Sequence, residues 1–83
     1  MKIIFRLNDI NNNKVITLGI VKMPSSKVAI DTWNDIYENE EYTAFIADLI
    51  DSSGYTILDK CVSYESIENL TNTSISDLIN QAR

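Results

Sequence analysis

The sequence predicts a single α+β domain over residues 1–83, in which a four-stranded, mainly antiparallel sheet has helices packed on one face. Three observations predict this fold. Two pairs of strand-like segments are each joined by turn-forming residues, one helical apolar stripe lies between the pairs, and two helix-capping signals follow the second pair. The expected element order is therefore ββαββα(α). A chain of 83 residues has room for one hydrophobic core.

The first pair of strands is predicted over residues 2–8 and 15–23. In the first segment the apolar residues on one face alternate with the rest, as in a half-buried strand: Ile3, Phe5 and Leu7. Residues 8–13 form an Asn-rich turn, because Asn and Asp tolerate the left-handed backbone region. Pro24 ends the second strand, since proline has no N–H to donate to a ladder.

A helix is predicted over Ser26–Asn39, with Ser25 or Ser26 as its N-cap. One side of it is apolar: Ala29, Ile30, Trp33, Ile36 and Tyr37. Trp33 lies in the middle of this stripe and is expected to be buried in the core. The opposite side carries three carboxylates: Asp31, Asp35 and Glu38.

The second hairpin is predicted over residues 43–51 and 55–62. The apolar run Phe45–Ile50 would suit a buried strand or a short helix. The following Asp-Ser-Ser-Gly sequence at 51–54 has the chemistry of a hairpin turn, which favours the strand.

Two short helices are expected to complete the chain. Ser63 can cap a helix over residues 64–70, and residues 71–73 break it. Ser74 and Asp77 have the spacing of a capping box for a last helix over residues 75–82. The expected order, a hairpin followed by a helix and two more strands, is similar to that of a β-grasp domain. No residue motif accompanies the similarity.

Charge is distributed unevenly along the chain. Between Val28 and Asp59 there are eight carboxylates and no Lys or Arg, whereas the first 27 residues hold five basic side chains and one acid, Asp9. The net charge of −5 argues against direct binding to nucleic acid or to an anionic membrane. The pattern predicts either an acidic surface for a basic partner or a surface that only keeps the protein soluble.

The composition argues against catalysis, cofactors and metal sites. There is no His, and the two glycines form no phosphate-binding loop. The carboxylates do not have the spacing of a calcium loop. The single Cys61 is expected to be a packed structural thiol in a cytoplasmic protein, because one cysteine cannot form an internal disulfide. No apolar stretch has the length of a membrane span.

The predicted partner-binding residues surround the end of the Ser26–Asn39 helix: Asp31, Asp35, Glu38, Glu40 and Glu41, with Tyr37 and Tyr42 beside them. Asp31 and Asp35 are like charges one turn apart, and the glutamates crowd a helix C-terminus, where the macrodipole favours cations. Local rules broken without compensation are typical of functional sites.

The leading hypothesis is a small, acidic, non-enzymatic protein that presents carboxylates to a basic, nucleic-acid-binding surface of a protein partner. An inhibitor of a host defence nuclease, encoded by a phage or another mobile element, would have this character, and the heavy use of Ile and Asn is typical of AT-rich genomes. The alternative is a β-grasp-like or sheet-edge interaction module with an apolar contact surface.

Overall fold

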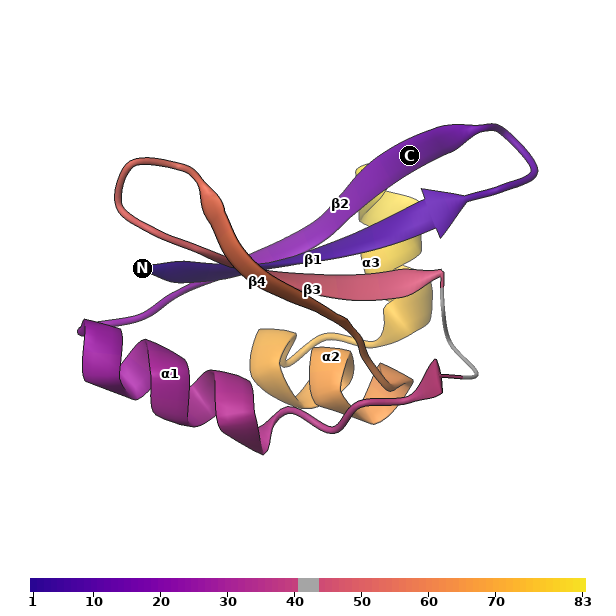
Figure 1. Cartoon of the computed structure of the whole chain (residues 1–83). Coiled ribbons are helices and arrows are strands. Elements are labelled where there is room, and N and C mark those ends of the chain that lie inside the picture. Colours follow the sequence, from indigo (N-terminus) through magenta and orange to yellow (C-terminus); the bar gives the residue numbers. More distant parts are fainter. Residues whose placement is uncertain (41–43) are drawn as a thin grey trace.

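The computed structural model describes residues 1–40 and 44–83, and it confirms the α+β class and the order ββαββαα. The elements are β1 (Lys2–Asp9), β2 (Lys14–Lys22), α1 (Ser26–Asp35), β3 (Phe45–Ile50), β4 (Thr56–Cys61), α2 (Tyr64–Thr71) and α3 (Ile75–Ala82). The strands form one sheet in the order β2-β1-β3-β4, and every neighbouring pair is antiparallel (Figure 1).

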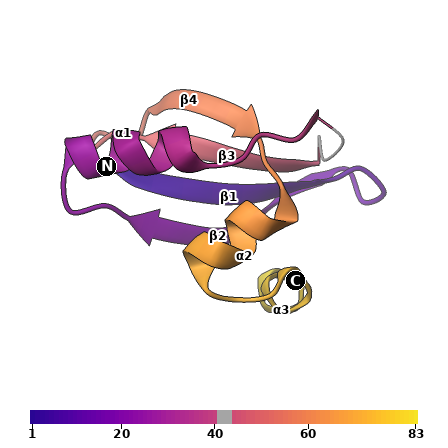
Figure 2. The same ribbon diagram turned by 90° about the horizontal axis from the view of Figure 1, so that it is seen from below.

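The core lies between the sheet and the helices. Helices α1 and α2 lie on the same face of the sheet, and α3 packs against β2 at the sheet margin, where Figure 2 shows it end-on. The largest fully buried side chains come from β1, β3, α2 and the residue after β4: Ile3, Phe5, Leu49, Ile67 and Val62. Trp33 of α1 is 5% exposed, which confirms its predicted place in the core.

A β-bulge interrupts the alternation that the sequence predicts for the first hairpin. Phe5 is opposite Gly19, whereas the next residue of β1 is opposite Thr17, so Leu18 has no residue opposite it. Beyond the bulge Gly19 approaches α2 so closely that an added Cβ would lie 3.1 Å from the Thr71 methyl group. Ile20 is consequently on the helix-free face and is 53% exposed.

The remaining turns and caps follow the predicted chemistry. Gly54 has a φ of 89°, and its N–H donates to the carbonyl of Asp51 at 3.1 Å. Asn72, with a φ of 54°, ends α2 in the left-handed conformation. The Ser74 hydroxyl accepts the amide of Asp77 at 3.2 Å and caps α3.

Helix α1 ends at Asp35, so the predicted extension to Asn39 is wrong. Ile36 has an extended ψ of 125°, and its side chain is buried. The Nζ atom of Lys60, on β4, lies 2.6 Å from the carbonyl oxygen of Trp33 and 3.2 Å from that of Ile36. The Trp33 carbonyl also accepts the Ile36 amide at 3.2 Å. The lysine thus adds a second donor to Trp33 and supplies one to Ile36 beyond the helix end.

The face of the sheet away from α1 and α2 carries an ion pair at its centre. Arg6 on β1 binds Asp48 on β3 through two hydrogen bonds, one of which joins Nη2 and Oδ1 at 3.1 Å. The Asp48 side chain is 9% exposed and that of Arg6 is 27% exposed. Arg6 alternates with buried neighbours on β1, which places the pair opposite the helices.

Candidate protein-binding surface

The structure distributes the predicted acidic residues over α1 and the segment that follows it. Asp31 and Asp35 are exposed on α1, whereas Glu38 and Glu40 are exposed beyond its end. The prediction that Glu38 shares a helical face with the two aspartates is wrong, because α1 stops before it. Tyr37 is 68% exposed. Two other predicted residues, Glu41 and Tyr42, lie outside the described residues.

Backbone hydrogen bonds fix the segment after α1 against the start of α2. The Tyr37 amide donates to the Ser66 hydroxyl at 3.0 Å, and the Ser63 amide donates to the Tyr37 carbonyl at 3.3 Å. Glu38 forms a β-bridge with Val62. Glu65, exposed in the first turn of α2, therefore belongs to the same end of the molecule. Sequence reasoning missed it because it is distant in the chain from the other acids.

Lys60 compensates the helix end that the sequence leaves without a cation. Its side chain is 10% exposed, its Nζ lies 4.7 Å from the centroid of the Trp33 ring, and it lies 3.9 Å from a carboxylate oxygen of Glu38. The cation that the macrodipole favours is thus supplied by β4 rather than by the helix. The acidic residues at this helix end are therefore not uncompensated, because Lys60 supplies the missing cation from a distant part of the chain. This removes one reason for assigning a function to the helix end.

The buried amine of Lys60 predicts a pH-dependent contribution to stability. Burial lowers the pKa of Lys60, and the nearby Glu38 carboxylate opposes this in part. Between the folded and the higher unfolded pKa the unfolded chain binds more protons, so the free energy of unfolding rises with pH. We expect urea titrations from about pH 8 to about pH 11 to show this rise for the wild type relative to Lys60→Met. A difference between the two that stays flat or falls would contradict it.

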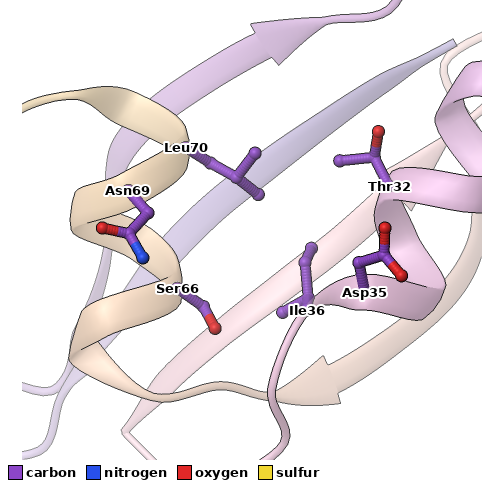
Figure 3. Close-up of a pocket in the computed structure, with 6 residues that line it drawn as sticks. All are labelled: Thr32, Asp35, Ile36, Ser66, Asn69 and Leu70. Carbon is purple, nitrogen blue, oxygen red and sulfur yellow. The ribbon is translucent and has the colours of Figure 1, made fainter.

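A hollow of about 260 Å³ lies between α1 and α2. Figure 3 shows the six residues that line it: Thr32, Asp35, Ile36, Ser66, Asn69 and Leu70. The side chains of Ile36 and Leu70 project toward the gap from opposite elements, while Asp35 and Thr32 lie on one side and Ser66 and Asn69 on the other. The hollow thus combines an apolar lining with polar groups on both helices.

The polar groups of the hollow favour a cation. Asp35 provides a carboxylate, and Thr32 adds a hydroxyl oxygen. The Ser66 oxygen already accepts hydrogen bonds from the Tyr37 amide and the Ser63 hydroxyl, so the cation would rely on Asp35 and Thr32. A lysine or arginine side chain suits such a site, because its stem is apolar and its end is charged.

Among the described acids of this surface, Asp31, Asp35 and Glu40 are not neutralised by the protein's own cations, whereas Glu38 is paired with Lys60. Arg6, Lys60 and Arg83 form ion pairs with Asp48, Glu38 and Asp9, respectively. Within residues 1–40 and 44–83, no Lys or Arg forms an ion pair with Asp31, Asp35 or Glu40. These carboxylates are therefore available to an external cation.

Comparison with protein-family models, with curated proteins and with solved structures found no match. None of the helices in the described ranges combines the length and the apolar character needed to cross a bilayer. In the same ranges no three acidic or cysteine side chains are grouped as ligands of a metal ion would be. Cys61 is a free thiol, half-buried at the end of β4.

Proposed function

We propose that this protein is a small, acidic, non-enzymatic binding domain that presents carboxylates to a basic surface of a partner protein. The hollow between α1 and α2 carries the proposal, because Asp35 lines it together with the apolar residues Ile36 and Leu70. A lysine or arginine of the partner would lay its stem against the apolar lining and its charge against Asp35. Asp31, one helical turn away, extends the negative surface.

A protein surface that holds nucleic acid is the partner surface that fits best. Such surfaces expose rows of Lys and Arg that neutralise phosphates, and carboxylates one helical turn apart, about 6 Å between Cβ atoms, can engage neighbouring members of a row. We therefore propose inhibition of a cytoplasmic nucleic-acid enzyme, such as a host defence nuclease blocked by a protein from a phage or another mobile element. Small size, the net charge of −5 and the Ile- and Asn-rich composition support this assignment.

Charge reversal tests the proposed surface. Capture from a host lysate with the wild-type protein would identify the partner, and calorimetry would then give its affinity. The double variant Asp31→Lys/Asp35→Lys is expected to bind at least about 30-fold more weakly, because each partner cation would meet a like charge. Wild-type affinity should also fall steeply with salt, since screening acts over about 8–10 Å near physiological ionic strength.

The matched control reverses two exposed carboxylates elsewhere, Asp59 on β4 and Asp77 on α3, and changes the net charge equally. This control is expected to bind within a few-fold of the wild type. Full binding by the Asp31/Asp35 variant would refute the assignment of the site. Equal losses in both variants would show that net charge, and not this surface, determines binding. Circular dichroism melts establish that each variant is folded.

A further inference from the structure

Strand β2 forms one edge of the sheet and exposes part of its backbone hydrogen-bonding groups. The Met23 amide donates to the Met1 carbonyl at 3.0 Å, so these residues form a hydrogen-bonded antiparallel pair. Hydrogen-bonded and non-hydrogen-bonded pairs alternate along such a ladder. Lys22 and Ile20, the alternate residues of β2, therefore direct their N–H and C=O groups away from β1 and toward the free edge.

A groove of about 430 Å³ accompanies this part of the edge. Residues 18–22 of β2 line one side of it, and α2, α3 and the turn between them line the other. The helical side has two apolar residues, Leu70 and Leu78, and a polar margin formed by Thr71, Thr73 and Gln81. A strand added to β2 would direct alternate side chains into this groove.

The same end of the β2 edge carries positive charge on the helix-free face of the sheet, where Lys22 of β2 is opposite Lys2 of β1. Lys22 also borders a second hollow, of about 440 Å³, which Lys2 lines as well. Asp51 is in that hollow, but its carboxylate accepts the amides of Ser53 and Tyr55 at 2.9 and 3.0 Å. Within the described part of the chain neither lysine forms an ion pair. The two ammonium groups therefore favour a carboxylate on a strand added to this edge, at a side chain that alternates with those directed into the groove.

We propose that the β2 edge and this groove form a docking site for an extended, acidic segment of another protein, which adds to the sheet as a fifth strand. The free backbone groups select an extended chain, the Leu70–Leu78 lining takes an apolar side chain, and Lys22 with Lys2 takes a carboxylate. The site goes beyond the proposed function, since it lies on the other side of α2 from Asp35 and shares with the first hollow only Leu70.

A second copy of this chain is a poorer occupant. Two β2 strands paired antiparallel about Leu18 would place Lys14 of each copy opposite Lys22 of the other. Like charges directly opposite each other destabilise a strand pair. The edge therefore disfavours its own strand and favours an acidic one.

A random-sequence peptide library selected on the immobilised protein tests the site. We expect the selected peptides to alternate apolar and polar residues and to carry a carboxylate, and their affinities can be measured by fluorescence anisotropy. Ile20→Pro should weaken binding at least about tenfold, because proline removes an edge-directed N–H and obstructs the incoming strand. β1 does not use that N–H, so the sheet is retained.

The matched control is Ile20→Thr, which changes the same exposed side chain and keeps the N–H, and it should bind like the wild type. Lys22→Glu should weaken the binding of acidic peptides about tenfold or more. It should strengthen the binding of peptides whose acidic residue is replaced by lysine. N-methylation of alternate peptide amides should abolish binding to the unmodified protein, which makes the test independent of the folding of any variant.

Several outcomes would overturn the docking site. The library could yield no peptide. The selected peptides could bind Ile20→Pro, or bind after N-methylation, with full affinity. Sedimentation could show that this chain forms a dimer that excludes the peptides. The Asp31→Lys/Asp35→Lys variant should bind the peptides normally. Failure at the β2 edge and failure of the proposed acidic surface are therefore distinguishable.

Discussion

Replacing Trp33 by alanine is expected to lower the free energy of unfolding by about 3–5 kcal/mol, most of the stability of a domain this small. The side chain is 5% exposed in the core between α1 and the sheet. Alanine would leave a cavity there and would remove the ring over which the Lys60 amine lies. The buried lysine would then keep its desolvation and lose its cation–π contact.

Far-UV circular dichroism during urea unfolding measures this effect without relying on the fluorescence of the deleted residue. Trp33→Phe keeps an aromatic ring and should lose clearly less stability than Trp33→Ala. Ile30→Ala is a control on the same helix, where the side chain is 38% exposed and its loss should have a small effect. A Trp33→Ala protein within about 1 kcal/mol of the wild type would show that the ring does not support the core.

Removing Arg6 is expected to have the second large effect. Arg6→Leu should destabilise the protein by about 3 kcal/mol, because it leaves the Asp48 carboxylate unpaired where its side chain is 9% exposed. The double variant Arg6→Leu/Asp48→Leu should recover most of this loss, since replacing a poorly hydrated ion pair by apolar groups removes both desolvation penalties.

A four-member cycle of the wild type, Arg6→Leu, Asp48→Leu and the double variant measures the coupling by urea unfolding. We expect the stability losses of the two single variants to sum to more than the loss of the double variant. Losses that simply add would mean that Arg6 and Asp48 do not stabilise each other. In that event the stability of the helix-free face would come from its apolar side chains.

The hairpins and caps were predictable because their determinants are local. The turn at Asp51–Gly54 and the capping box of Ser74 and Asp77 each lie within four residues. The bulge at Leu18 was not predictable in this way, because register depends on which neighbours β2 meets. The close approach of Gly19 to Thr71 shows one such distant neighbour.

The same distinction applies to the candidate surface. The acidity around Asp35 could be seen in the sequence, whereas the end of α1 depends on Lys60 and the hollow depends on Ser66 and Asn69 of a different helix. No local pattern links these residues. Glu38 was placed on the wrong element for that reason, and the compensating cation was missed.

The order β2-β1-β3-β4 also determines how the chain must assemble. Each hairpin joins neighbours in sequence, but the central contact pairs β1 with β3 and places Leu7 opposite Phe45. Closing that long loop carries an entropic penalty before the core is formed, so the contact should limit the folding rate. A two-stranded hairpin is marginally stable by itself. A chain still emerging from a ribosome therefore gains no stable structure from its first hairpin until β3 arrives to join it.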